Sequence, residues 1–158
     1  KSFAVPGLRV GFLVVPTDYL EAAESLKVLL NICPNLPGQL LAERLLERSP
    51  LLLKAHRSHL GRCRDLFLKA CGRHSLPLLN YPRAGFYGII DLPKNIDSMM
   101  AARMLATEYG VATAPGSDFA EIDPGFLRVN FAGSSADVEE AVGRIAKCLQ
   151  RMAGCDRS

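Results

Sequence analysis

Residues 1–16 read KSFAVPGLRVGFLVVP and join a bend to an apolar run. The bend contains Pro6 and Gly7, and it separates Lys1 from Arg9 by eight positions. The run that follows, 9–16, is mostly apolar, rich in β-branched residues and bounded by glycine and proline. Such a run is typical of a buried strand, so the stretch predicts a bend that leads into a strand of an α/β structure.

The composition indicates a compact globular protein. The chain has 158 residues, of which 49% are hydrophobic and 22% are charged, and this length allows a full core. The charges nearly balance, with 19 Lys and Arg against 16 Asp and Glu, and no basic run gathers them, so we expect no nucleic-acid partner. Charged residues, proline or glycine interrupt every apolar run, so we expect neither a membrane span nor a signal peptide. Because the chain begins at Lys1 instead of methionine, we expect it to be part of a longer protein.

The cysteines are odd in number and scattered, which predicts reduced thiols and a cytoplasmic protein. They are Cys33, Cys63, Cys71, Cys148 and Cys155. Helical spacing would place His56, His59 and Cys63 on one side of a helix. No paired Cys-x-x-Cys accompanies them, so we expect no metal site.

Helical patterns dominate the part of the chain after Pro16. We expect Asp18 to cap a helix over 18–30, and Ser49 with Pro50 to begin a long helix over 50–71 that Gly72 ends. Between these two helices we expect a loop over 33–38 and a further helix over 39–48.

After Pro77 the pattern changes to short strands alternating with helices, which predicts a small α+β unit with its helices on one face of a sheet. Asp97 and Ser135 are the expected caps of its two helices, the first of which ends at Gly110. The expected strands are 85–92, 111–113 and 126–132, and a long loop over 114–125 joins the last two.

Arg128 lies in the middle of the last predicted strand, among apolar neighbours. Strand alternation places it on one face with Phe126 and Asn130. A guanidinium in such a strand needs an anion, which is either a carboxylate of the protein or a bound one.

The first eleven residues resemble the signature around the cofactor lysine of the class I/II pyridoxal-phosphate aminotransferases. That signature is Lys, two free positions, a small residue, an apolar one, a free position, Gly, a free position, Arg, an apolar residue and Gly, and residues 1–11 meet all of it. Further matches follow in the family's order at Asn35, 82–87, 115–119 and Arg128. Only Ala84 and Ala120 stand where glycine is usual, and essentially all 158 residues are covered.

The resemblance implies the fold of the C-terminal half of a fold-type I pyridoxal-phosphate enzyme, starting at the cofactor lysine. It implies three parts: 1–49 as the remainder of the large α/β cofactor-binding domain, 50–75 as an interdomain helix, and 76–158 as the small α+β domain. It further implies a homodimer with the N-terminal half of the same protein, and amino acid and 2-oxo acid substrates.

The resemblance also implies a role for each site residue. Lys1 would bind the aldehyde of pyridoxal 5'-phosphate as a Schiff base and then move the α-proton of the substrate. Arg9 would hold the cofactor phosphate, and Arg128 would pair with the substrate α-carboxylate, since a planar guanidinium fork suits both groups. Asn130, Ser117 and Tyr87 are equally well explained as pocket residues or as turn and sheet residues.

Other functions remain open at this level, because a fold does not determine a reaction. The same scaffold supports decarboxylation, carbon–sulfur lysis and cyclising elimination with the same cofactor. A non-enzymatic alternative is the sensor half of a transcription regulator, and another is an α/β packing fragment without cofactor.

Overall fold

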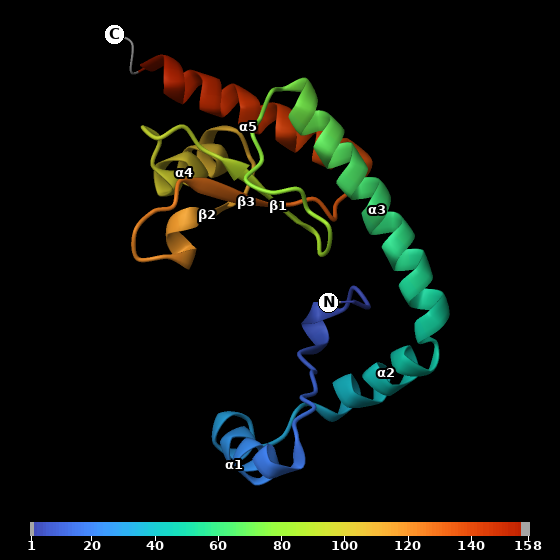
Figure 1. Cartoon of the computed structure of the whole chain (residues 1–158). Helices are drawn as coiled ribbons and strands as arrows, with labels where there is room; N and C mark the ends of the chain where they lie inside the picture. Colours follow the sequence, from blue (N-terminus) through green and yellow to red (C-terminus); the bar gives the residue numbers. More distant parts are fainter. Residues whose placement is uncertain (1, 156–158) are drawn as a thin grey trace. The chain divides into compact units, whose positions relative to one another are not determined.

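The computed structural model describes residues 2–155, apart from the side chain of Cys155, and the chain divides into two compact units (Figure 1). The first unit is Lys1–Ser58 and the second is His59–Ser158. The division falls inside the long helix α3 (Ser49–Arg73). This helix includes Ser49, which was expected to precede it as the cap, and runs past Gly72, which was expected to end it. Within the described residues, no helix combines the length and the apolar character needed to cross a membrane.

The first unit consists of short helices. The 3₁₀ turns Pro6–Leu8 and Thr17–Tyr19 precede α1 (Leu20–Leu30), and α2 (Leu36–Glu47) follows. The predicted loop 33–38 is wrong in its second half, because the Asn35 side chain accepts a hydrogen bond from the Gly38 N–H at 2.6 Å and so caps a helix that begins at Leu36. Proline in the first turn of a helix sacrifices no internal hydrogen bond, so Pro37 fits there.

Two other predictions for this unit are wrong. Residues 9–16 form no strand, because a strand requires hydrogen bonds to a neighbouring strand and no described segment pairs with them. Phe12 is accordingly 83% exposed and Val14 85% exposed. Asp18 does not cap α1 either, since it lies inside the 3₁₀ turn Thr17–Tyr19 and the N-cap residue Tyr19 makes no capping hydrogen bond through its side chain.

The second unit is built on a three-stranded antiparallel sheet in the order β1-β3-β2 (Figure 1). The central strand β3 (Phe126–Asn130) pairs with β1 (Tyr87–Asp91) and with the short β2 (Ala114–Pro115). Helix α4 (Ser98–Glu108), the 3₁₀ turn η3 (Gly116–Phe119) and helix α5 (Ser135–Cys155) complete the unit. The two longer strands predicted for this part of the chain, 85–92 and 126–132, are therefore confirmed with shorter bounds.

The helix ends of this unit correct two predictions. Residues 111–113 are not a strand, because Gly110 has a φ of +65° and the Val111 N–H bonds back to the Leu105 carbonyl at 2.9 Å, which ends α4 in a left-handed cap. The cap of α5 is Ser134 instead of Ser135, since the Ser134 hydroxyl accepts the Asp137 N–H at 3.2 Å. Asp97 is confirmed as the cap of α4, accepting the Met100 N–H at 2.7 Å.

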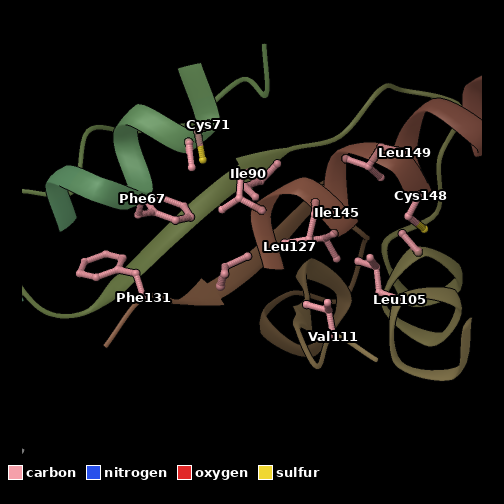
Figure 2. Close-up of a cluster of buried hydrophobic side chains, with 14 of the residues drawn as sticks. Phe67, Cys71, Ile90, Leu105, Val111, Leu127, Phe131, Ile145, Cys148 and Leu149 are labelled. Atoms are coloured by element: carbon pink, nitrogen blue, oxygen red, sulfur yellow. The ribbon is translucent and has the colours of Figure 1, made fainter. Parts of the chain in front are cut away.

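One face of the sheet forms the core (Figure 2). Burial alternates along β1 and β3, so that Ile90, Leu127 and Val129 are buried while their neighbours in sequence are partly covered or, at Asn130, exposed. Buried side chains of three helices complete this core, namely Phe67 and Cys71 of α3, Leu105 of α4, and Ile145, Cys148 and Leu149 of α5. Each large apolar side chain buried in this way contributes about 1.5–3 kcal/mol. The opposite face of the sheet is left for other contacts.

Gly88 lets α3 approach the sheet. The rings of Phe67 and Phe131 lie with their centroids 5.4 Å apart, and a Cβ atom at Gly88 would overlap the ring of Phe67. Phe67 is completely buried, so its ring has no free space into which it can move.

Gly88→Ala is therefore expected to lower the free energy of unfolding by about 1–3 kcal/mol, the usual cost of overpacking a core. The measurement is chemical denaturation of the protein that carries this chain. Gly72→Ala is the matched control, because nothing lies within 4 Å of a Cβ at that position of α3. An unchanged midpoint for Gly88→Ala would contradict the packing described here.

Buried thiols in the core are expected to be unreactive. Burial raises the pKa of the Cys71 thiol to about 12, and burial is also the main cause that raises the pKa of Cys148. The reactive thiolate at pH 8 is then a fraction of about 10⁻⁴ for Cys71. Peptide mapping after N-ethylmaleimide treatment at pH 8 should find both residues unmodified in the native protein and modified in denaturant. Fast native labelling of Cys71 would contradict the burial.

Candidate functional site

The first predicted site residue, Lys1, lies outside the described residues, and the bend that follows it is described. Arg9 ends the 3₁₀ turn Pro6–Leu8 in a left-handed conformation with φ +53°. Its N–H bonds to the Pro6 carbonyl at 3.2 Å and its Nη1 reaches the same oxygen at 3.3 Å. The turn therefore folds the arginine back onto its own backbone.

Asn35 holds this bend against the start of α2. Its Nδ2 donates to the Leu8 carbonyl at 2.9 Å, while its Oδ1 accepts from Gly38. A Cβ at Gly38 would lie 2.5 Å from that Oδ1 and 2.9 Å from Val10 Cγ2, so only glycine permits this approach. The backbone on both sides of Arg9 is thereby fixed. Arg9 itself is exposed and has no salt bridge within the described part of the chain.

Arg128 occupies the middle of the central strand, on the face opposite the core. It is paired with Ile89 of β1 on one side and with Ala114 of β2 on the other. Residues directly opposite in an antiparallel pair share a face, so the small side chain of Ala114 leaves room beside the guanidinium. Asp91 lies diagonally across on the same face, yet no salt bridge joins Arg128 to it or to any other described carboxylate.

Two aromatic rings pack against the Arg128 guanidinium. The ring centroids of Tyr87 and Phe119 each lie 4.5 Å from its Cζ. The Nε atom is buried and has no hydrogen-bond partner among the described residues. A cation on an aromatic face is stabilised by the negative potential of the ring, but its N–H groups still need acceptors. The site therefore holds a positioned cation with hydrogen-bonding capacity that the described residues leave unused.

The loop that carries Phe119 is anchored to the start of α4. The Asp123 carboxylate accepts the Ser98 N–H at 2.7 Å and the Gly125 N–H at 3.0 Å, and the Ser98 hydroxyl accepts the Ser117 N–H at 3.2 Å. Burial alone, the largest influence, raises the pKa of Asp123, but the hydrogen bonds from Ser98 and Gly125 together outweigh it and hold this pKa below its usual value. The carboxylate is thus ionised while it accepts the N–H of Ser98, the first residue of α4.

The arrangement can bind anions at two places. Arg9 lies in the first unit and Arg128 in the second, and each has a guanidinium that no described carboxylate neutralises. Guanidinium groups bind carboxylates and phosphates through paired, charge-assisted hydrogen bonds. No salt bridge joins Arg128 to a described carboxylate, so the described residues supply no anion for its guanidinium.

Sequence reasoning missed Phe119 and Asp123 as parts of the site and left Tyr87 undecided. Tyr87 shares the face of Arg128 by strand alternation, so register alone would have found it once β1 and β3 were paired. Asp123-Pro124-Gly125 is a turn signal that local reasoning assigns to the backbone. Only the folded loop shows that Asp123 reaches Ser98, 25 residues away in the sequence.

Two other features of the described residues do not belong to this site. Cys63 Sγ lies 3.6 Å from His59 Nε2, but no group of three or more His, Cys, Asp or Glu side chains in 2–155 is arranged to hold a metal. A cavity of about 350 Å³ lies between the end of α4 and the start of α5 and contains neither Arg9 nor Arg128. Its Arg144 already bonds to the Tyr109 carbonyl and to Glu140.

Known proteins of similar sequence and structure agree on one family. Residues 1–145 match the model of the family described as aminotransferase class I and II. The valine–pyruvate aminotransferase of Mycobacterium tuberculosis is 32% identical over 152 residues, which are 94% of this chain and 39% of that protein. The chain therefore spans about two fifths of the length of the curated relatives that it matches.

Solved structures give the same result. The aromatic aminotransferase of Pyrococcus horikoshii superposes with a TM-score of 0.82 at 28% identity, over 97% of this chain and 42% of that one. The aspartate aminotransferase of Thermus thermophilus with maleate superposes with a TM-score of 0.80 at 31% identity, over 94% of this chain and 39% of that one. The fold is thus that of part of a fold-type I transferase, and the chain belongs to the class I and II aminotransferases.

Proposed function

We propose that the protein carrying this chain is a pyridoxal-phosphate-dependent enzyme that transfers the amino group of an amino acid to a 2-oxo acid. The observation that supports it best is Arg128, a guanidinium packed against two rings on the open face of the sheet, with a buried Nε that lacks an acceptor among the described residues. Every amino acid and every 2-oxo acid has a carboxylate beside its reacting carbon. One fixed arginine can therefore serve both substrates.

Arg128 orients the substrate in this proposal. A bidentate pair with the α-carboxylate fixes two points of the substrate, and this determines where the Cα–H bond points. The rings of Tyr87 and Phe119 keep water from part of the guanidinium, which strengthens its attraction for the carboxylate because the local dielectric constant falls. The main contribution of this residue is thus binding and orientation.

The residues near the start of the chain fit a phosphorylated cofactor. Arg9 is exposed, has no described carboxylate partner and lies on a bend that Asn35 holds in place, and these are the properties of a phosphate-binding arginine. Pyridoxal 5'-phosphate, when bound, supplies an electron sink that stabilises negative charge at the substrate Cα. By the resemblance, Lys1 attaches the cofactor and afterwards holds the proton removed from Cα.

The proposal extends to the whole protein. Residues 1–49 would complete a large cofactor-binding domain, 50–75 would form the interdomain helix and 76–158 the small domain. The exposed apolar residues of 12–14 are then covered by the rest of the large domain. We propose a cytoplasmic homodimer. The relatives named above are all aminotransferases, which favours transamination over decarboxylation, carbon–sulfur lysis or cyclising elimination on the same scaffold.

Arg128→Gln should weaken substrate binding in the full-length holoenzyme. We expect the KM of both the amino acid and the oxo acid to rise roughly 100-fold, because a bidentate charged pair is lost. The substrate is first found by testing the twenty protein amino acids for amino transfer to the bound cofactor. Arg103→Gln is the matched control, since Arg103 is an exposed arginine of α4 without a described salt bridge. Unchanged KM values for Arg128→Gln would refute its assignment.

Lys1→Ala should abolish turnover, since no other amine would be placed to move the Cα proton. Borohydride treatment of the unaltered holoenzyme should link the cofactor covalently to the peptide that contains Lys1, as mass spectrometry of a digest would show. Lys27→Ala is the control, because Lys27 is an exposed lysine of α1. Labelling of any other lysine in place of Lys1 would overturn the assignment.

A further inference from the structure

We propose that Asp123 is a positioning residue which, by anchoring the loop of Phe119, holds one aromatic ring against Arg128 and so sets the affinity for the substrate carboxylate. This inference rests on the proposed function. It assigns a role to a side chain that lies outside the cofactor-lysine signature and outside the predicted site residues.

Asp123 joins two elements that are far apart in the sequence. One carboxylate oxygen accepts the N–H of Ser98 at the start of α4, and the other accepts the N–H of Gly125, one residue before β3. Gly125 has a φ of +68° and its carbonyl accepts the Leu92 N–H at 2.8 Å, so the turn is tied to the end of β1 as well. A negative charge at the start of a helix is also favoured by the helix dipole. The far end of the loop is therefore fixed to α4 and to the sheet.

The near end of the loop is fixed by the same residue of α4. Ser98 is completely buried, and its hydroxyl accepts the Ser117 N–H at 3.2 Å and lies 3.5 Å from the Ser117 hydroxyl. Buried polar groups of this kind are costly when they lose their partners. Ser98 thus meets the loop at two points, Ser117 and Asp123, and Phe119 lies between them.

The position of Phe119 depends more on these anchors than the position of Tyr87 does. Phe119 is 49% exposed, and its ring packs against Arg128 at 4.5 Å and stacks on Phe126 with centroids 6.0 Å apart. Tyr87 belongs to β1, and its place beside Arg128 is set by the ladder of β1 with β3. Releasing the loop therefore removes one ring from the guanidinium and leaves the other.

The consequence is specific to carboxylate binding. Without the Phe119 ring, water reaches more of the guanidinium and the side chain gains rotational freedom, and both effects weaken a bidentate pair. In the proposed function Lys1 and Arg9 hold the cofactor, whereas Asp123 and Phe119 act only on Arg128, so we expect cofactor retention and the proton transfer step to be unaffected. The expected signature is a raised KM with a nearly unchanged kcat.

The test compares Asp123→Ala with Glu121→Ala in the full-length holoenzyme. Glu121 is an exposed acid of the same loop without a described salt bridge, so its removal changes the charge but not the anchors. We expect Asp123→Ala to raise the KM of both substrates roughly 3- to 10-fold, the range of a lost cation–π contact. The dissociation constant of an analogue of the amino acid that lacks its amino group should rise by the same factor of about 3 to 10. Calorimetric titration measures this binding without turnover. Asp123→Asn, which keeps one acceptor oxygen, should give a smaller effect.

A double-mutant cycle then separates positioning from general destabilisation. If Asp123 acts through Phe119, Asp123→Ala should add almost nothing to the loss caused by Phe119→Ala, whereas independent effects would add. Full additivity overturns the inference, as does an unchanged dissociation constant in Asp123→Ala while Arg128→Gln weakens binding. A fall in kcat and cofactor content that parallels the thermal midpoint also overturns it. If Arg128→Gln itself leaves binding unchanged, the carboxylate assignment in the proposed function fails instead.

Discussion

The antiparallel pairing of β3 with β1 and β2 is the constraint on which the second unit depends. It directs Leu127 and Val129 into the core, where they meet side chains of α3, α4 and α5, and by the same alternation it directs Arg128 to the opposite face. A slip of one residue would bury the guanidinium and expose the core. The apolar contacts that stabilise the fold therefore also maintain the orientation of the proposed substrate-binding group.

The surroundings of Arg128 suit its proposed role as a substrate-binding cation. A nearby carboxylate would neutralise it and compete with a substrate, but the described residues instead supply two aromatic rings, which stabilise a positive charge without using its N–H groups. Tyr87 comes from the sheet and Phe119 from a loop that Asp123 and Ser98 anchor. The position of Tyr87 is thus set by the pairing of β1 with β3, and that of Phe119 by side-chain hydrogen bonds of Asp123 and Ser98.

Several features of the sequence that act over a few residues were predicted correctly, although the caps expected at Asp18 and Ser135 were wrong. Asp97 at the cap of α4, Gly110 at its end and the two longer strands follow from local chemistry, since an aspartate cap or a left-handed glycine needs only its neighbours. The failures concern pairing and alternative local bonds. Residues 9–16 have the composition of a strand but no described partner, and 111–113 end a helix because Val111 bonds back to Leu105.

By itself, the sequence determined the family, through the spacing of Lys1, Gly7, Arg9 and Gly11, and the candidate anion-binding residues Arg9 and Arg128. It did so because a signature is a property of order along the chain. The tertiary structure decided what surrounds Arg128: which face it occupies, which rings touch it, and that Asp123 anchors the loop beside it. These depend on contacts between residues far apart in the sequence, and such contacts exist only after the strands have paired and the core has closed.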